Sequence, residues 1–458
     1  MEFYVGGGGT NIDRTTQVTC DPTKAYPKGA PAPVDLWLAQ PNGGAEGPAV
    51  GLNGSFPCAA EPPSSMHIPG APHVNVCPND DDGSGCPPYP GFPGEQVAGC
   101  KYEDALFTDF VLKTIADHDP AEPLFVFWAP HIAHTPLQVP KRHLDLFAHV
   151  QDWRRRRYLA MVNYLDASIG AVVDALKKKG MFESTLVTFS ADNGGPVYAN
   201  GTSGGSNWPL RGGKASNFEG GIRVNGWVSG GALPDAVRST KKSGLATPWD
   251  WWSTFAEIGG NIDPVDHKAA AAGLPPVDSI SQWQYWSGAT DTPPRKVLAV
   301  GSCVSPSLRR RHPENHGFDL WCTTPDDVTT AGGVLVDEGP GGGLWKLLRE
   351  PVIPMNGWQG PSFPNLTVST DYSKDLGREC ADGCLFQLDA DPTEHHDVSA
   401  DPANAARVKK MGALLKKLNA SAFTPDRGTG PDFEASCEAA HERWGGFWGP
   451  FVDVDVHG

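Results

Sequence analysis

Two short polar segments each follow a run of apolar residues, and both carry side chains that could do chemistry. The first segment, 130–137, contains His134, and the second, 190–195, contains Asp192 and Asn193. Histidine can move protons near neutral pH, whereas carboxylate and amide oxygens are ligands that hard cations prefer. Asp-Asn-Gly is also typical of an Asx turn at a strand end. The second segment alone therefore leaves a metal site and a plain turn both open.

A third segment adds positive charge and glycine. It reads N-W-P-L-R-G-G-K over Asn207–Lys214, followed by F-E-G-G-I-R over Phe218–Arg223. A lysine such as Lys214 can stabilise the oxygens of a transferring anionic group. The alternative is a surface loop with ordinary basic residues.

The elements that would position these segments read as α/β. Apolar runs at 124–129 and 185–189 predict strands buried on both faces, and the apolar periodicity of 158–176 predicts a helix between them. Strand, helix, strand predicts a βαβ unit and a mostly parallel sheet flanked by helices. Ligands of such sheets bind at the carboxyl ends of the strands, where both polar segments begin. A further strand is predicted at 222–228.

Other elements surround this unit. Helices are predicted from Tyr102 to Ile115 and from Thr247-Pro248 to Gly259-Gly260, and a strand at 296–300. Beyond 301 the pattern changes to short strands and one late helix, which predicts a smaller C-terminal α+β subdomain. We expect three parts: an irregular Gly/Pro/Cys-rich part (1–100), an α/β core (101–300) and the C-terminal subdomain (301–458). The late elements are strands at 344–348 and 384–388 and a helix at 402–418 with Asp401 as its cap.

Composition limits the partners. The 458 residues include 37 Lys and Arg against 53 Asp and Glu, a formal charge of −16. This balance argues against nucleic acid as a partner, although a local basic region such as Arg154–Arg157 could still bind a different polyanion. No apolar run reaches the length that a membrane span needs, so we expect none. The sequence does not indicate an oligomeric state.

Cysteines and sequons indicate the secretory pathway. The first hundred residues lack apolar periodicity, so disulfides are the natural stabiliser, with zinc as the alternative reading. Four N-x-S/T sequons, at Asn53, Asn200, Asn365 and Asn419, favour the same compartment. The residues after Met1 do not resemble a signal peptide, which disagrees with that compartment. The ten cysteines stand at positions 20, 58, 77, 86, 100, 303, 322, 380, 384 and 437.

The order of these motifs resembles the sulfatase family, and within it the arylsulfatase B type (N-acetylgalactosamine-4-sulfatase). The resemblance runs from P-H-I-A-H-T-P-L through S-A-D-N-G-G, N-W-P-L-R-G-G-K and F-E-G-G-I-R to the late L-F-Q-L-D-A-D-P-T-E, covering about 100–420. It implies an alkaline-phosphatase-like α/β fold with a smaller C-terminal domain. It also implies a calcium ion, hydrolysis of a sulfate ester, and a sulfated carbohydrate or small sulfate ester as substrate.

By the same resemblance, individual residues take roles. Asp192 and Asn193 match metal ligands, and Lys214 matches the lysine that holds a sulfate oxygen near the leaving group. His134 matches the histidine that contacts the sulfate and protonates the leaving oxygen. The other histidines nearby have no motif match and are interpreted as structural; they are His131, His143 and His149.

The family's nucleophile has no match. It is a formylglycine made from cysteine or serine in a C-x-P-S-R motif, upstream of the His134 segment. Cys20 has the C-x-P spacing without the arginine, and Cys303 lies after the metal motif, so we reject both. We expect an N-terminally truncated sulfatase that is inactive alone. The alternatives are an inactive protein that binds sulfated glycans, a phosphohydrolase of the alkaline phosphatase superfamily, and a purely structural module.

Overall fold

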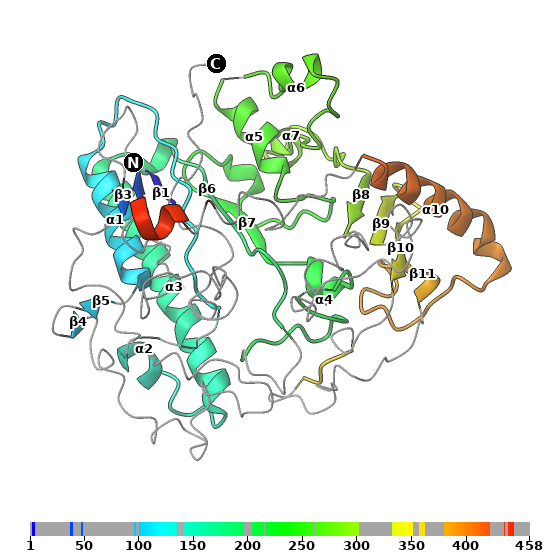
Figure 1. Cartoon of the computed structure of the whole chain (residues 1–458), viewed down its shortest axis with the longest axis horizontal. Helices are drawn as coiled ribbons and strands as arrows, with labels where there is room; N and C mark the ends of the chain where they lie inside the picture. The colour runs from blue at the N-terminus through cyan, green and yellow to red at the C-terminus, as the bar shows by residue number, and fades with distance from the viewer. Residues whose placement is uncertain are drawn as a thin grey trace. The chain divides into compact units, whose positions relative to one another are not determined.

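The structure is a computed structural model of the 458-residue chain, and it forms two compact units (Figure 1). Unit one comprises Met1–Lys179 and Asp426–Gly458, and unit two comprises Gly180–Pro425. The structure describes residues 103–134, 137, 139, 141–196, 204–214, 216–260, 262–301, 332–350, 357–361, 380–421, 435 and 438–443, together with five short strands before residue 102.

Unit one is built around two helices. Helices α1 (Glu103–Asp117) and α3 (Trp153–Lys179) pack side by side, and α2 (Lys141–Asp145) contacts α3. Both long helices were expected from the sequence. The remaining elements are β1 (Glu2–Tyr4), β2 (Trp37–Ala39) and β3 (Gly47–Pro48) in one antiparallel sheet, the pair β4 (Gln96–Val97) and β5 (Cys100–Lys101), and the π-helical turn η9 (Ala439–Arg443).

The core of unit one lies under α3. Trp153, Met161 and Tyr164 are buried there with Leu137, the last residue of the first polar segment, and with Val139 just beyond it. Among the described helices, α3 alone is long and apolar enough to cross a membrane by length and composition, a weak indication that core helices of folded proteins also give.

The predicted strand at 124–129 is wrong. These residues belong to no strand, and the side chains of Phe125 and Phe127 are 70% and 84% exposed. An apolar run becomes a buried strand only where flanking strands and helices cover it, and the run itself does not supply those neighbours. The predicted βαβ unit is therefore not formed by the described residues.

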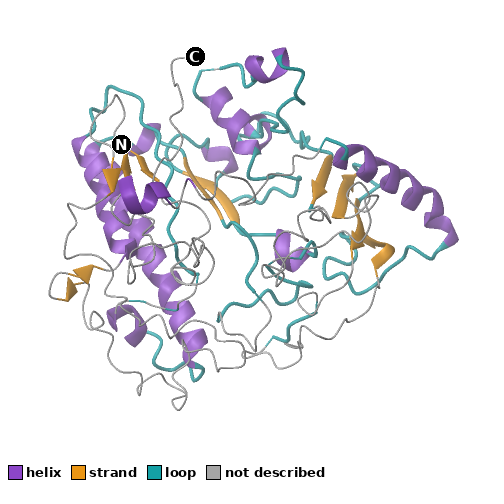
Figure 2. Cartoon of the chain, in the orientation of Figure 1, coloured by secondary structure: helices purple, strands orange, loops and turns teal. Residues whose placement is uncertain are grey.

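The first sheet of unit two is an antiparallel pair. Strand β6 (Val187–Ser190) runs antiparallel to β7 (Gly226–Ser229), with Val187 opposite Ser229. The prediction of a parallel sheet is thus wrong for this pair, because the chain returns through a long loop to the neighbouring edge rather than crossing over. Part of the strand predicted at 222–228 instead lies in the short helix α4 (Glu219–Ile222). Figure 2 shows the loops that link these elements.

The second sheet of unit two has four antiparallel strands in the order β11-β10-β9-β8. They are β8 (Val297–Val300), β9 (Gly332–Asp337), β10 (Leu344–Glu350) and β11 (Cys380–Gln387). Helix α10 (Ala405–Asn419) covers one face, with Met411 and Leu415 packed on Leu347, and the opposite face packs against Phe218 beside α4. The late helix was expected, and Asp401 caps the turn η8 (Pro402–Asn404) that leads into it.

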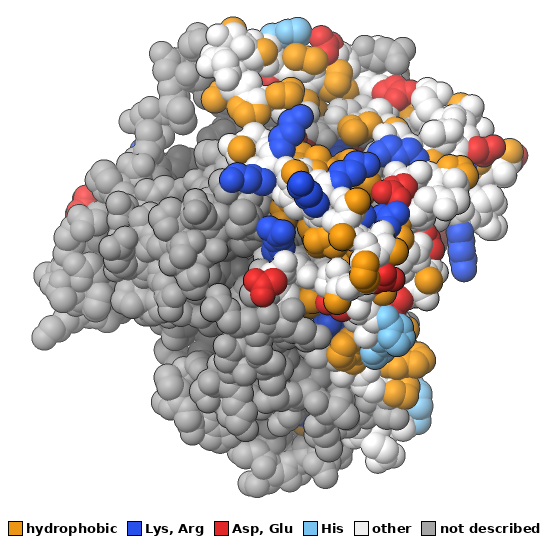
Figure 3. Space-filling view, turned by 90° about the vertical axis from the view of Figure 1, so that its right-hand side faces the viewer, with side chains coloured by type: hydrophobic (Ala, Val, Ile, Leu, Met, Phe, Trp, Pro, Cys, Tyr) orange, Lys and Arg blue, Asp and Glu red, His pale blue; other side chains and the backbone are white. Residues whose placement is uncertain are grey.

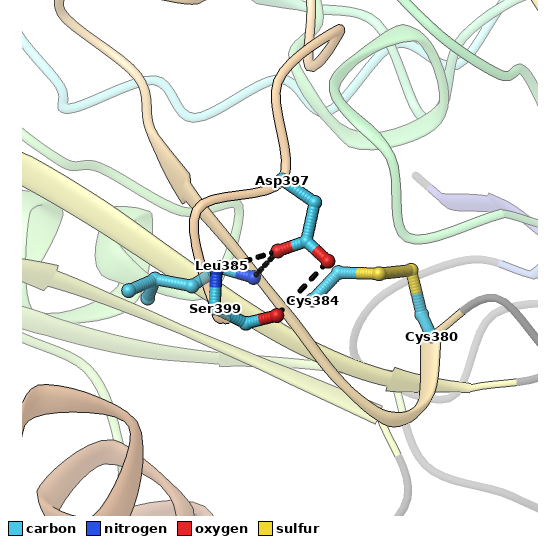
Figure 4. Close-up of a disulfide and its surroundings, with 5 residues drawn as sticks. All are labelled: Cys380, Cys384, Leu385, Asp397 and Ser399. Carbon is cyan, nitrogen blue, oxygen red and sulfur yellow. Dashed lines mark hydrogen bonds between the residues drawn. A yellow bond between two sulfur atoms is a disulfide. The ribbon is translucent and has the colours of Figure 1, made fainter. Parts of the chain in front are cut away.

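Helices α5 (Asp250–Ile258), α6 (His267–Ala271) and α7 (Trp283–Trp286) and the short 3-10 turns η3 (Phe182–Ser184) and η5 (Asp235–Val237) complete unit two. Thr247 is not the residue that caps α5; its N–H donates to the buried Asp250 carboxylate, which also pairs with Arg295. Cys380 and Cys384 form a disulfide at one end of β11, and Asp397 accepts hydrogen bonds from Leu385 and Ser399 beside it (Figure 4). Cys100 lies in β5, and the remaining seven cysteines lie outside the described residues.

The described structure is mixed helix and sheet, as the α/β prediction requires. The C-terminal sheet and its helix are present. Strand β8 lies before the boundary expected at residue 300, yet it pairs with β9 of this sheet. The division of the chain into three parts stays a prediction.

Candidate functional site

The Asp192–Asn193 pair sits in the loop that leaves β6. The Asp192 carboxylate accepts the Asn193 N–H at 2.7 Å, and the Asn193 side-chain amide donates to the Gly194 carbonyl at 2.9 Å. Asp192 is exposed and Asn193 is half-buried. These local bonds fix the turn as an Asx turn does, and they leave oxygens of both side chains available to a hard cation.

The Asn207 side chain joins this loop to the third segment. Its Oδ1 accepts the Gly195 N–H at 2.9 Å, and its Nδ2 donates to the carbonyls of Gly195 (2.7 Å) and Gly212 (3.0 Å). Its own N–H donates to Oε1 of Gln359 at 2.6 Å. One amide thus satisfies backbone groups on two loops and holds them at fixed spacing.

Glycines allow the three segments to touch through their backbones. A Cβ on Gly194 would lie 1.7 Å from the Gly220 carbonyl oxygen, and one on Gly220 would lie 2.2 Å from the Gly212 carbonyl oxygen. The Gly194 N–H donates to the Gly221 carbonyl at 2.9 Å, and the Gly220 N–H donates to the Arg211 carbonyl at 2.6 Å. The paired glycines of each motif are therefore explained by close backbone approach.

Lys214 lies in the same loop cluster as the predicted metal ligands. Its backbone N–H donates to the carbonyl of Gly195 at 3.1 Å, two residues beyond Asn193, and its side chain is half-buried. The structure thus brings Asp192, Asn193 and Lys214 into one assembly of loops. A lysine and hard oxygens are the groups that bind a small oxyanion together with a cation.

Arg211 anchors the Lys214 loop by packing. Its guanidinium lies 4.0 Å from the centroid of the Phe218 ring and 4.3 Å from that of Trp358, and the residue is buried. Trp358 in turn stacks on His395 and donates its indole N–H to the Thr393 carbonyl. This cation–π sandwich ties the loop to the late D-P-T-E turn.

A buried ionic cluster lies directly behind α4. Nζ of Lys346, on β10, is 3.0 Å from Oε1 of Glu219 and 2.8 Å from Oε1 of Glu394. The Glu219 N–H donates to the other oxygen of Glu394 at 2.7 Å. Lys346 and Glu394 are fully buried and Glu219 is nearly so. The cluster connects the C-terminal sheet and the late turn to the helix on which the glycine loops pack.

Charge balance in this cluster shifts two pKa values. Burial alone would lower the pKa of Lys346, but the charges of Glu394 and Glu219 outweigh burial and raise it. Burial raises the pKa of Glu394; the charge of Lys346 opposes this, and that of Glu219 adds to it. Burial and the charge of Glu219 therefore hold the pKa of the Glu394 carboxyl above its ordinary value, against the charge of Lys346.

His134 belongs to unit one, whereas Asp192, Asn193 and Lys214 belong to unit two. The His134 N–H donates to the His131 carbonyl at 2.9 Å, and the His131 N–H donates to Asp104 at 3.1 Å. The side chain of His134 is half-buried. That His134 acts with Lys214 stays a prediction.

The residues present fit calcium in kind but supply few of its ligands. Asp192 and Asn193 offer hard oxygens, whereas calcium takes about six to eight. Within the described ranges, no group of three or more His, Cys, Asp or Glu side chains could hold a metal ion. Further calcium ligands would have to come from outside the described residues.

Sequence reasoning missed the buried cluster. Alternation along β10 places Lys346 on the same face as the buried Leu348, and a lysine on an apolar strand face needs a buried partner. That signal could have identified Lys346. Its partners, Glu219 and Glu394, lie 127 and 48 positions away along the chain, and spacing alone does not pair them.

Comparison with known proteins agrees with these motifs. Residues 72–260 match the family model described as Sulfatase. Arylsulfatase J of Mus musculus is 29% identical over 365 residues, covering 76% of this chain and 53% of that protein. N-acetylgalactosamine-6-sulfatase of Sus scrofa is 33% identical over 171 residues, covering 37% of this chain and 30% of that protein. The chain thus spans about half the length of arylsulfatase J and less of the second relative.

The fold also has a solved counterpart. The crystal structure of Ps i-CgsB in complex with k-i-k-neocarrahexaose matches with a TM-score of 0.50 at 21% identity, covering 74% of this chain and 59% of that one. At this identity the match establishes a likeness of fold.

Proposed function

This chain belongs to the sulfatase family, and from that premise we propose that it is part of a calcium-assisted sulfuric ester hydrolase. The observation that carries the proposal is the interlocked set of loops that holds Asp192, Asn193 and Lys214 together. These are the residues that match the family's metal and sulfate motifs. Their backbones are fixed by Asn207 and by glycine contacts, which is the pre-organisation that charge stabilisation requires.

Lys214 is proposed to hold an oxygen of the sulfuryl group. A sulfuryl group in transfer spreads negative charge over its oxygens, and an ammonium held by a rigid loop stabilises that charge without reorganising. His134 is proposed to donate a proton to the leaving oxygen, which a histidine can do near neutral pH.

Asp192 and Asn193 are proposed to hold calcium, together with ligands from outside the described residues. When bound, the ion would add positive charge beside the sulfuryl oxygens. The paired orientation of the two side chains by the turn at Asn193 supports this role.

The nucleophile is proposed to lie in polypeptide upstream of the sequence given. The chain has no C-x-P-S-R motif from which a formylglycine could form, and it covers 53% of arylsulfatase J. The exposed apolar run at 124–129 supports the same idea, because additional strands would bury Phe125 and Phe127.

The proposed substrate is a sulfated carbohydrate or a small sulfate ester. One relative is named N-acetylgalactosamine-6-sulfatase, and the related fold of Ps i-CgsB was solved with an oligosaccharide bound. We place the protein in the secretory pathway, and the Cys380–Cys384 disulfide supports an oxidising compartment.

The test is sulfate release from 4-nitrophenyl sulfate by the longest translation product that contains this chain. Lys214→Ala is expected to lower kcat about 10²- to 10³-fold, and Lys241→Ala, an exposed lysine elsewhere in unit two, is the control. Removal of calcium by a chelator should lower the rate and calcium should restore it. An unchanged rate in Lys214→Ala would overturn the assignment.

A further inference from the structure

Helix α10 carries a concentration of positive charge that the candidate site does not use. Its sequence, A-A-R-V-K-K-M-G-A-L-L-K-K-L-N, contains five basic residues and no acidic one, in a protein of net charge −16. The helix lies at the edge of unit two, on the side that faces the viewer in Figure 3, where Lys and Arg side chains gather.

The lysines of α10 share one exposed face. The opposite face packs on the sheet through Val408, Met411 and Leu415. Seven residues are nearly two turns, so Lys409 and Lys416 lie in line about 10 Å apart, as do Lys410 and Lys417. The four exposed lysines therefore form two rows along the helix, which we call the lysine stripe.

Glu338 is a carboxylate near the lysine stripe, and its charge acts on Lys410 without a direct ion pair. Arg407, the fifth basic residue, pairs with Glu338 at 2.9 Å and lies over the Trp345 ring. Glu338 is thus already satisfied by a guanidinium. Within the part of the chain that the structure describes, none of the four lysines forms an ion pair with a carboxylate. Four ammonium groups held on a rigid helix gain from a polyanion whose charges repeat along its length.

We propose that the lysine stripe of α10 is a docking surface for a sulfated polysaccharide, separate from the loops that hold Lys214. The proposal rests on the proposed function, since it names the polymer that presents the sulfate ester. Lysine offers compact point charges that suit sulfates on a flexible sugar chain. The helix contains no aromatic residue on which bases could stack, and this favours a glycan over single-stranded nucleic acid.

The experiment measures binding of fluorescently labelled heparin to the 458-residue chain by anisotropy at several salt concentrations. The four-lysine variant K409Q/K410Q/K416Q/K417Q should bind at least about tenfold more weakly, with a smaller dependence on salt. Lysine and glutamine have similar helix propensity and the four side chains are exposed, so the variant should fold, which far-UV circular dichroism checks.

Two pairs of lysines provide a matched comparison. K416Q/K417Q removes two charges from the last turn of α10, and K177Q/K178Q removes two from the last turn of α3. The α10 pair should weaken binding about threefold or more, and the α3 pair less than about twofold. Equal effects of the two pairs, or unchanged binding by the four-lysine variant, would overturn the proposal.

Competition identifies the ligand class. Unlabelled heparin should displace the probe at far lower concentration than hyaluronan, which is unsulfated, or duplex DNA. If duplex DNA displaced the probe as well as heparin does, the lysine stripe would bind polyanions in general, and the proposal of a glycan ligand would be contradicted. If the unmodified chain did not bind heparin, the docking proposal would also be overturned. The proposed function would not be affected by that result, because it is tested separately by sulfate release from the longer product.

Discussion

Removing the charge of Lys346 should destabilise unit two more than removing any exposed lysine. Lys346→Met keeps a side chain of similar length but leaves the carboxylates of Glu219 and Glu394 facing each other in a site closed to water. Breaking a buried ion pair by removing one partner costs about 3–5 kcal/mol. We expect Lys346→Met to cost this much near pH 7.5.

Two further variants separate charge from packing. Lys296→Met removes a lysine that pairs with Asp337 at 2.8 Å but is 41% exposed, so it should cost less than about 1 kcal/mol. Adding Glu394→Gln to Lys346→Met removes one of the two opposed carboxylates. The double variant should therefore recover at least about half of the loss.

The pKa shifts of Lys346 and Glu394 determine how the stability of the cluster changes with pH. The raised pKa of Lys346 means that its contribution is complete below its ordinary value of 10.5 and is lost only as pH rises through the raised value. The raised pKa of Glu394 means that stability falls as pH rises from 4.5 through the raised value. Without the lysine, the charge that opposes the rise in the pKa of Glu394 is gone, so Glu394 protonates more readily and the cost of Lys346→Met should shrink toward pH 5.

The assay is urea unfolding followed by tryptophan fluorescence, since Trp345 lies beside Lys346 on β10. The reasoning is refuted if Lys346→Met costs no more than Lys296→Met, or if its cost grows as the pH is lowered. A cost that the double variant does not reduce would show that lost packing, rather than opposed charge, is the cause.

Three other results are expected. Gly194→Ala should lower the urea midpoint of unit two and weaken sulfate binding, because the added Cβ would lie 1.7 Å from the Gly220 carbonyl oxygen. Gly195→Ala should change both far less, because its Cβ would lie 3.4 Å from the nearest atom. Equal effects of the two variants would contradict the packing argument. Arg211→Ala should cost about 2–3 kcal/mol through two lost cation–π contacts, and thermal unfolding that shows full retention of stability would contradict it. Partial burial tends to raise the pKa of Asp391, but hydrogen bonds from the backbone of His396 and His395 lower it. The stabilisation by Asp391 is therefore present above pH 3.8 and should be lost as the pH falls through the lowered pKa. If the difference in urea midpoint between Asp391→Asn and the unmodified chain stayed constant from about pH 6 to pH 3, this expectation would be contradicted.

The sequence predicted those elements whose signals are local. Helix α3 follows from apolar periodicity, and α10 from Asp401-Pro402 at its start. The predicted face of α3 was only partly right: Met161 and Leu176 are buried, but Val162 is 42% exposed. Which face of a helix is buried depends on the elements packed against it, and periodicity does not identify those elements.

Strand pairing could not be predicted in the same way. The apolar runs at 124–129 and 185–189 look alike in sequence, yet only the second forms a strand, and its partner runs antiparallel. Pairing depends on contacts distant along the chain. The loop motifs were more informative, because glycine pairs and Asn207 encode a backbone approach that few other residues permit. The sequence offered no signal that connects Lys346 to its two carboxylates.

The central claim is that these loops serve hydrolysis of a sulfate ester. The most direct measurement is to map the 5′ end of the transcript, express the longest product that contains this chain, and compare the hydrolysis of 4-nitrophenyl sulfate and 4-nitrophenyl phosphate with that by residues 1–458 alone. We predict that the longer product releases sulfate in preference to phosphate and loses this activity in Lys214→Ala, while residues 1–458 alone release neither. A longer product that prefers phosphate, or that releases sulfate equally well without Lys214, would contradict the account.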